Sequence, residues 1–261
     1  MMAVVSKLRP FVLDKLAQLG EMVMLFADIL KTTFTRRPRW AETIEQMYRI
    51  GWQSQAVVLI TGAFTGMVFA VQTLVQFHKV KMDTAVGPVV SIAMARELAP
   101  VLTALIVAGR VGAAIAAELG TMKVTEQLDA LRAMGTAPVD YLAVPRFVAL
   151  VVALPLLTAE GIAFGIYCGY LVAVHLKGVD AAYFVSNMFK FTAAKDVISG
   201  LLKSICFGMF IASISCYKGF NAGEGAEGVG RATTQAVVVS SLTVLVSNYF
   251  IAELFNAIIP P

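Results

Sequence analysis

The chain has 261 residues, of which 58% are hydrophobic and only 15% are charged. Because ordinary soluble domains hold fewer apolar and more charged residues, this composition excludes a soluble globular protein and indicates an integral membrane protein. The net charge of +4 is small and gives no support for nucleic-acid binding.

Residues 1–34 form the first predicted element, an amphipathic helix. Apolar residues recur there at steps of three or four, and charged residues take the other faces. Such a helix either lies in the cytoplasmic headgroup layer or packs on a partner, and we favour the interfacial position. Pro38 ends it, because proline lacks the amide donor that a helix needs. The charges scattered through the first 30 residues argue against a cleavable signal peptide.

Five long apolar segments follow, and each is long enough to cross a bilayer as a helix. They comprise residues 54–77, 84 to about 117, 147–176, 191–217 and about 235–259. None shows the alternation of apolar and polar residues that a membrane β-barrel requires. The predicted fold is therefore an all-α integral membrane protein with an interfacial helix and five transmembrane helices. It forms one domain over 1–261, with a transmembrane core over 45–259 and a cytoplasmic loop at 119–146.

The distribution of positive charge predicts the orientation of these five spans. With the N-terminus in the cytoplasm, the inside segments carry thirteen of the 21 lysines and arginines. The outside segments carry only Lys79, Lys81, Lys177, Lys190 and Lys195. Because cytoplasmic segments are enriched in lysine and arginine, the 119–146 loop is expected inside and the C-terminus outside.

Small residues are spaced for helix packing in two of the spans. Span one contains GAFTG, with Gly62 and Gly66, and span three contains GIAFGIYCG, with three further glycines. Glycines four residues apart let another helix approach closely, either within one subunit or at a subunit interface. The three cysteines also lie inside spans without a CxxC pair, so no disulfide and no metal site is predicted.

The 119–146 loop contains one charged, helix-forming segment, TEQLDALRAMG, at residues 125–135. Thr125 can cap its start and Gly135 can end it, which leaves a helix of about nine residues. Glu126, Asp129 and Arg132 recur every three residues along one side. The segment is either a solvated connector or a docking element for a cytoplasmic partner.

Charged residues also fall inside the predicted spans, where each is costly to bury. Glu97, Lys203 and Glu160 lie near the middle of spans two, four and three, Arg96 is next to Glu97, and Asn248 lies mid-way along span five. We predict that Glu97 and Lys203 pair, with Asn248 bridging them. This polar cluster acts as a structural lock, as a gate or as a lipid-headgroup site.

Two further features have simpler interpretations. Arg110, in AGRVG at the end of span two, either snorkels towards headgroups or contacts the 125–135 helix. The segment GEGAEGVG satisfies GxGxxG, but a membrane span precedes it, and its two glutamates would repel a pyrophosphate. It is therefore predicted to be a turn between spans four and five, and no GxxxxGK[ST] nucleotide motif is present.

The sequence closely resembles the MlaE permease family. The resemblance covers about residues 45–258 and is strongest in MARELAPVLTALIVAGRVGAAIAAELGTMKVTEQLDALRAMG (93–135), PRF (145–147), LPLLT (154–158) and GVGRATTQAVVVSS (228–241). It implies a homodimeric, non-catalytic permease subunit in the inner membrane of Gram-negative bacteria. The implied partners are two ABC ATPase subunits that bind ATP and Mg²⁺, a small cytoplasmic STAS-domain protein and a periplasmic ring of MCE-domain protein.

The implied cargo is glycerophospholipid that moves between the inner and outer membranes and maintains outer-membrane lipid asymmetry. By the same resemblance, the 125–135 helix couples to the ATPase, and a lipid pocket lies near the outer face between two subunits. The candidate wall residues of this pocket are Gln72, Leu74, Phe77, Tyr249 and Phe250. The family has a polar cluster at the matching intramembrane positions but commonly an acidic residue where this chain has Asn248, and Glu253 is expected to compensate.

Two other functions fit the sequence less well. An intramembrane enzyme needs a nucleophile with a base, or a metal site, but His78 and His175 lie at membrane edges without an HExxH motif. A secondary transporter or channel would use Glu97 and Lys203 as an ion relay, but five spans without inverted repeats argue against it.

Overall fold

The computed structural model describes residues 2–35, 39–79 and 81–258, and among these residues it contains helices and no strand. Five helical spans are long and apolar enough to cross a membrane, which confirms the predicted fold class. They are Trp40–Lys79, Val86–Val124, Val139–Leu176, Ala194–Phe220 and Gly225–Ala257. Pro38, the predicted helix breaker, lies outside the described residues.

The spans correspond to the following elements. Span one is α2 (Trp40–Lys79), span four is α9 (Ala194–Phe220) and span five is α10 (Gly225–Ile258). Span two joins α3 (Val86–Ala93), α4 (Ala99–Val107) and α5 (Ala113–Val124) through the π-helical segments η2 (Met94–Leu98) and η3 (Ala108–Gly112). Span three consists of η4 (Val139–Ala143), α7 (Val144–Leu171) and η5 (Val172–Leu176). A short 3-10 turn, η1 (Asp83–Ala85), precedes α3.

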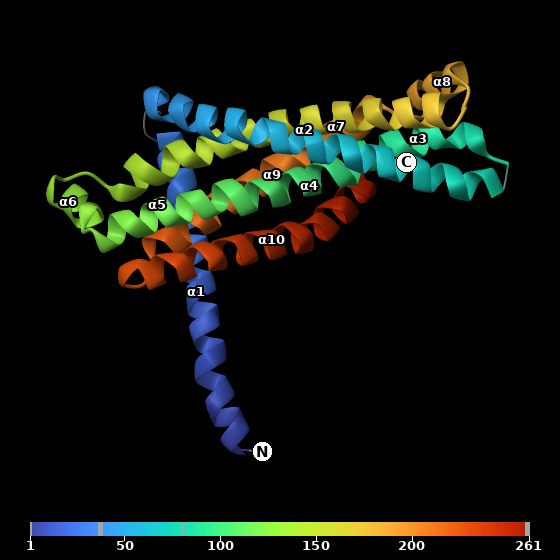
Figure 1. Ribbon diagram of the computed structural model, residues 1–261. Coiled ribbons are helices and arrows are strands. Elements are labelled where there is room, and N and C mark those ends of the chain that lie inside the picture. Colours follow the sequence, from blue (N-terminus) through green and yellow to red (C-terminus); the bar gives the residue numbers. More distant parts are fainter. Residues whose placement is uncertain (1, 36–38, 80, 259–261) are drawn as a thin grey trace.

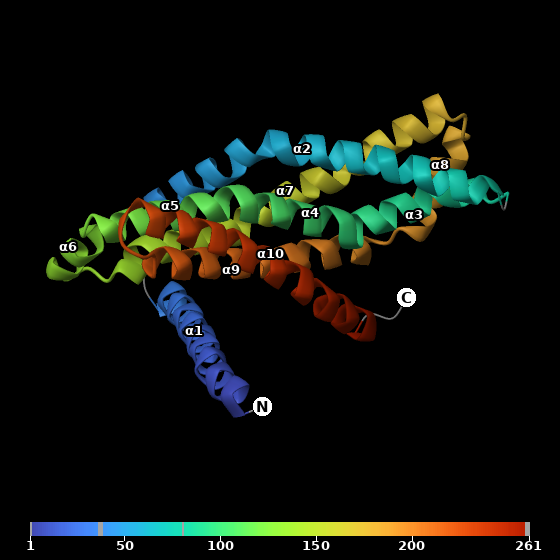
Figure 2. The ribbon, with the colours of Figure 1, turned by 60° about the horizontal axis from the view of Figure 1, so that its bottom comes forward.

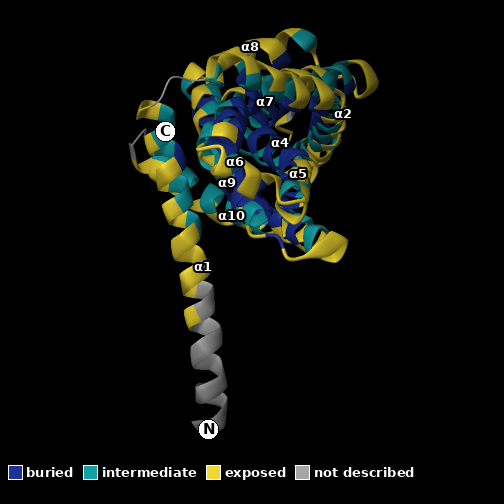
Figure 3. Ribbon diagram, turned by 90° about the vertical axis from the view of Figure 1, so that its left-hand side faces the viewer, coloured by how far each residue is buried: buried dark blue, intermediate teal, exposed yellow. Residues whose placement is uncertain are grey.

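The spans pack as an elongated bundle in which α2 lies along α7, α7 along α9, and α9 along α10 (Figures 1 and 2). The middle helices α4 and α5 contact α9 and α10 from span two. Seen from the α6 end, buried residues occupy the centre and exposed residues the outside (Figure 3). Many of the exposed residues are large and apolar, such as Phe64, Leu156 and Val246. An apolar outer surface of this kind suits contact with lipid rather than water.

Helix α1 (Met2–Thr35) crosses the bundle near its α6 end and extends away from it (Figure 1). Its C-terminal half is anchored by the fully buried Ile29 and by an edge-on contact between Phe26 and Phe147. Leu16 and Val23 stay exposed on the protruding part. A helix that runs across the bundle axis with apolar residues exposed has the position expected of an interfacial helix. The side chains of Val4, Leu8, Phe11 and Val12, which belong to the predicted apolar face, lie outside the described ones.

The glycines of spans one and three meet within the chain. Gly62 faces Gly161, and a Cβ added at Gly66 would overlap the backbone of Gly165. The close approach holds α2 and α7 side by side over much of their length. Of the two interpretations left open by the sequence, packing within one subunit is the one that the structure shows.

Two boundaries differ from the predicted ones. Helix α5 continues to Val124 and η4 already begins at Val139, so the connection between these two helical segments is residues 125–138 and is shorter than the predicted loop. Glu118 of α5 pairs with the buried Arg146 of α7 at 2.8 Å, so a polar contact joins the two helices that border this connection. In addition, helix α8 (Ala181–Phe191) was not predicted. It begins at Asp180, whose side chain accepts a hydrogen bond from the Tyr183 backbone N–H.

Candidate functional site

The end of the bundle opposite α8 carries a short helix, α6 (Gln127–Ala133), between spans two and three (Figure 1). The prediction that Thr125 caps this helix was wrong. The Thr125 hydroxyl donates instead to the Thr121 carbonyl of α5, and Glu126 takes the cap position in a left-handed conformation, with φ 59°. This sharp turn directs α6 back across the end of α5.

The predicted end of α6 at Gly135 is confirmed. Gly135 has φ 75°, and its N–H donates to the Arg132 carbonyl while the Thr136 N–H donates to the Leu131 carbonyl. These two bonds close the helix in the manner that glycine favours, because a side chain at this φ is strained.

Only one α6 side chain, Leu128, is buried, and it anchors the helix to the bundle. Glu126, Asp129 and Arg132 are all exposed, and Asp129 pairs with Arg132 at 2.8 Å. An exposed pair of this kind adds little to stability, so folding does not require these charges. They remain available on the outer surface of α6 for a second protein.

The intramembrane residues Glu97, Lys203 and Asn248 lie in contact. Lys203 Nζ donates to Glu97 Oε1 at 2.6 Å, and Asn248 Nδ2 donates to Glu97 Oε2 at 3.1 Å. Glu97 is therefore the shared centre that joins spans two, four and five, rather than Asn248 bridging the two charges. Glu253 is exposed and, among the described residues, makes no hydrogen bond to this polar cluster.

Burial within the polar cluster is unequal. The Lys203 side chain is 2% exposed, whereas that of Glu97 is 44% exposed. Lys203 also donates to the Arg96 carbonyl at 3.1 Å, so its ammonium group has two partners. A buried ammonium is tolerated only when it is paired and hydrogen-bonded. Glu97 thus neutralises Lys203 from the outer surface of the chain.

Arg96 does not join its neighbour Glu97. Its Nε lies 3.2 Å from Asp196 Oδ1, and its Nη2 donates to Asn256 at 3.5 Å. Asp196 also accepts the Ala193 N–H and so caps α9. Neither Asp196 nor Asn256 was predicted as a partner of Arg96. Ala193 stands where a capping box has Ser or Thr, so the sequence pattern carries no clear signal for a cap at Asp196.

Other polar residues predicted within the spans have separate partners. Glu160 accepts a hydrogen bond from Gln55 of α2 at 3.2 Å. Arg110 donates to Ser54 at 2.9 Å and to Gln53 at 3.4 Å. Arg110 therefore ties span two to span one, and among the described residues no hydrogen bond or ion pair joins it to α6.

The candidate lipid-pocket residues do not meet within one chain. Gln72 and Phe77 lie on α2, and Tyr249 and Phe250 lie on α10, on different sides of the bundle (Figure 1). Tyr249 and Phe250 are exposed and contact each other edge-on. Leu74, the remaining candidate, is buried in the core formed with α3 and α7, so it does not face outward from α2.

The prediction that GEGAEGVG forms a turn is only partly right, because Gly225–Gly230 already belong to α10 and the turn is residues 221–224. It connects α9 to α10, so a helix rather than a strand precedes it. A dinucleotide fingerprint needs a preceding strand, and this context is missing here.

Five spanning helices, a short charged helix at one end and a buried ion pair inside define a multi-pass helical membrane protein of the permease class. Comparison with known proteins makes the assignment specific. The family model of the permease MlaE matches residues 43–254. The chain belongs to the MlaE permease family.

Relatives named "Probable ABC transporter permease protein" agree with this assignment. One from Rickettsia prowazekii is 43% identical over 242 residues, which cover 92% of this chain and 93% of the relative. Another, from Synechocystis, is 44% identical and covers 88% of this chain and 86% of the relative. The chain is also 38% identical to Protein TRIGALACTOSYLDIACYLGLYCEROL 1, chloroplastic, of Arabidopsis thaliana, over 83% of this chain and 62% of that protein.

Proposed function

We propose that this chain is the membrane subunit of an ABC transporter that moves glycerophospholipids between the inner and outer membranes of a bacterium. Its N-terminus faces the cytoplasm and its C-terminus the periplasm. Two copies form the permease, and two ATPase subunits bind ATP and Mg²⁺. A STAS-domain protein and a periplasmic MCE-domain ring complete the complex, which maintains outer-membrane lipid asymmetry.

The observation that carries the proposal is the geometry of α6. This helix is held by one buried leucine, exposes its charged face, and connects directly to the span that contains Glu97. A force applied to α6 therefore reaches the polar cluster through α5 and α4. The π-helical segments η2 and η3 interrupt this path, and such segments are frequent at functional sites because they weaken the regular helix.

A lipid cargo is supported by two further points. The Arabidopsis relative is named after a glycolipid, trigalactosyldiacylglycerol. In addition, α10 is the least buried of the spans within one chain. Of the residues in its most apolar stretch, 11% are buried, against 33–56% in the other spans. Gln72, Phe77, Tyr249 and Phe250 remain candidates for a lipid pocket that a second copy of the chain would close.

The coupling role is tested by reversing the charges on α6. In a Glu126→Lys, Asp129→Lys double variant, we expect the ATPase subunit to be lost on co-purification and lipid transfer to fall with it. Folding should not change, because both residues are exposed and contribute little to stability. Co-purification and lipid transfer between vesicles are the measurements.

The matched control is Glu45→Lys. Glu45 is also exposed and paired, with Arg49 of the same helix α2, but it lies outside α6. The control should keep both the ATPase and lipid transfer. Unchanged co-purification and transfer in the α6 double variant would contradict the coupling role.

A further inference from the structure

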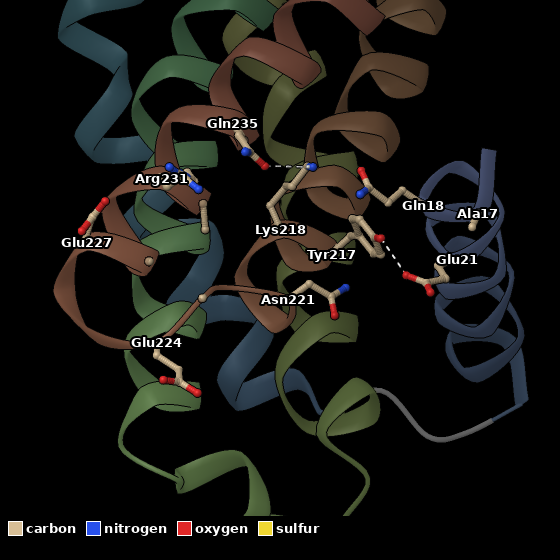
Figure 4. A pocket seen from close by; sticks show the side chains of 13 residues that line it. Ala17, Gln18, Glu21, Tyr217, Lys218, Asn221, Glu224, Glu227, Arg231 and Gln235 are labelled. Atoms are coloured by element: carbon tan, nitrogen blue, oxygen red, sulfur yellow. Dashed lines mark hydrogen bonds between the residues drawn. The ribbon is translucent and has the colours of Figure 1, made fainter. Parts of the chain in front are cut away.

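A polar pocket of about 740 Å³ lies where α1 crosses α9 and the start of α10 (Figure 4). Ala17, Gln18 and Glu21 of α1 form one wall. This wall is held in place because the hydroxyl of Tyr217, on α9, donates to Glu21 Oε2 at 2.8 Å. Tyr217 is buried, so its hydroxyl has a fixed position.

Charges of both signs line this pocket in a definite order. Glu224 and Glu227 belong to the turn and first residues of α10, whereas Arg231 and Gln235 follow one and two turns further along the helix. Lys218 of α9 lies beside them and donates to Gln235 at 3.2 Å (Figure 4). The cations therefore lie deeper along the bundle, and the carboxylates lie nearer its α6 end.

An apolar groove continues along the same two helices. It has a volume of about 510 Å³, and its apolar lining includes Phe210 of α9 and Leu242 and Val246 of α10. Arg231, Gln235, Leu242 and Val246 are separated by four, seven and four residues, so they share one face of α10. At 1.5 Å per residue, the groove begins about 10 Å beyond the pocket.

This arrangement matches one lipid molecule, and we propose that the pocket and groove bind a glycerophospholipid with an amine headgroup, such as phosphatidylethanolamine. Its phosphate binds Arg231 and Lys218, its ammonium group binds Glu224 and Glu227, and an acyl chain lies in the α9–α10 groove. One leaflet has about 15 Å of hydrocarbon, which is the reach from Gln235 to about Val246. The inference deepens the proposed function, because it names a lipid and where that lipid enters from the cytoplasmic leaflet.

The order of the charges favours this class of lipid. A headgroup with an outer ammonium and an inner phosphate finds opposite charges at both depths. An anionic headgroup such as phosphatidylglycerol would meet the three carboxylates that line the pocket, Glu21, Glu224 and Glu227, without a cation of its own. Free inorganic phosphate shares the arginine chemistry but makes no use of the carboxylates or of the groove.

The test measures lipid binding to the purified full-length chain by native mass spectrometry. Phosphatidylethanolamine and phosphatidylglycerol with identical acyl chains are titrated separately, and we expect the first to bind more tightly. Arg231→Gln should weaken phosphatidylethanolamine binding about tenfold, the loss expected for one charge-assisted hydrogen bond. Glu227→Gln should bring the affinities for the two lipids close to equality.

Matched variants separate specific from general effects. Arg39→Gln also removes a cation, but one that contacts Tyr141 away from the pocket, and it should leave lipid binding unchanged. Val246→Trp fills the groove, so it should weaken binding of the long-chain lipid but not of a dihexanoyl analogue. Arg231→Lys keeps the charge and should retain part of the binding, which shows that the fold is intact.

Three results would overturn the inference: equal binding of the two lipids by the unaltered chain, equal effects of Arg231→Gln and Arg39→Gln, or displacement of the lipid by millimolar inorganic phosphate. Binding is measured without the ATPase, so it is independent of transport. Specific binding together with a failed transfer assay would count against the proposed function alone. Lipid transfer without specific binding would count against this site alone.

Discussion

At the scale of single residues, adjacent positions in span two serve different helices. Arg96 contacts Asp196 near the start of α9, whereas Glu97 contacts Lys203 two turns further along the same helix and Asn248 on α10. Both arginine and glutamate lie in the π-helical segment η2. The side chains of consecutive helical residues point in different directions, so one turn of span two can hold two polar contacts at once.

The pairing of Lys203 with Glu97 inside the spans predicts that either single substitution destabilises the chain. Glu97→Leu leaves a 2% exposed ammonium without its counter-charge and should destabilise the chain by about 3 kcal/mol. Lys203→Met leaves a mid-span carboxylate whose exposed part faces lipid rather than water and which keeps only the Asn248 hydrogen bond, so it should cost a similar amount, about 3 kcal/mol. Thermal unfolding of both variants in detergent gives the comparison.

The double variant Glu97→Leu, Lys203→Met distinguishes a lock from a gate. A lock predicts that the double variant regains both thermal stability and lipid transfer, because no buried charge remains. A gate predicts recovered stability with transfer still lost. Unchanged stability in both single variants would show that the two charges do not depend on each other, contrary to the structure.

The pair formed by Glu97 and Lys203 was predictable from the sequence because two opposite charges inside apolar spans have few other ways to avoid the cost of burial. The contacts of Arg110 with Ser54 and of Arg96 with Asp196 could not be predicted from the sequence. Each depends on how two helices are rotated about their axes, and apolar composition carries no such information. The predicted cap at Thr125 was wrong for a related reason, because its hydroxyl donates to the Thr121 carbonyl of the preceding helix instead.

At the scale of helices, the glycine strip between α2 and α7 makes a sharp prediction. Gly66→Ala should push the two helices apart, because the added Cβ would overlap the Gly165 backbone, which has no freedom to move aside. We expect a loss of folded protein and a lower unfolding temperature. Gly51→Ala is the control on the same helix, where the added Cβ meets nothing within 4 Å. It should be neutral or slightly stabilising, because alanine favours the helix by about 1 kcal/mol.

Measurement of folded yield and unfolding temperature for both glycine variants checks this packing. Equal behaviour of Gly66→Ala and Gly51→Ala would mean that α2 and α7 do not approach as closely as described. The sequence predicted that glycines were used for packing, but it left open whether the partner was in the same chain. The three-dimensional structure answers this question, because α2 and α7 run parallel in a register that brings Gly62 to Gly161 and Gly66 to Gly165.

The existence of the five spans followed from apolar length, whereas their boundaries did not. Helix α2 begins at Trp40 and α5 ends at Val124, and both include polar turns beyond the apolar segment. Hydropathy records where a helix is apolar, and not where its backbone hydrogen bonds stop. Helix α8 was not predicted because its 11 residues are too few for a span, although Asp180 is a typical N-cap residue.

At the scale of the whole molecule, the two ends of the bundle are chemically different. The α6 end carries the exposed charged helix and is the one that α1 crosses, whereas α8 lies at the far end (Figure 1). The excess of lysine and arginine in segments at the α6 end is the basis for the proposed cytoplasmic position of that end. The proposed coupling and the proposed lipid site both require this orientation, because the ATPase and the cytoplasmic leaflet must meet the same end.

Labelling of introduced cysteines by a membrane-impermeant maleimide tests the orientation. The experiment uses a background in which Cys168, Cys206 and Cys216 are replaced by serine or alanine. Met134→Cys, next to α6 and 71% exposed, should react only in inverted vesicles, and Phe189→Cys, on α8 and 74% exposed, only in intact spheroplasts. Phe64→Cys is 62% exposed but mid-way along α2, so it should react from neither side, because maleimide needs a thiol in water. Reaction of Met134→Cys from outside would invert the molecule and place α6 beyond the reach of any cytoplasmic ATPase.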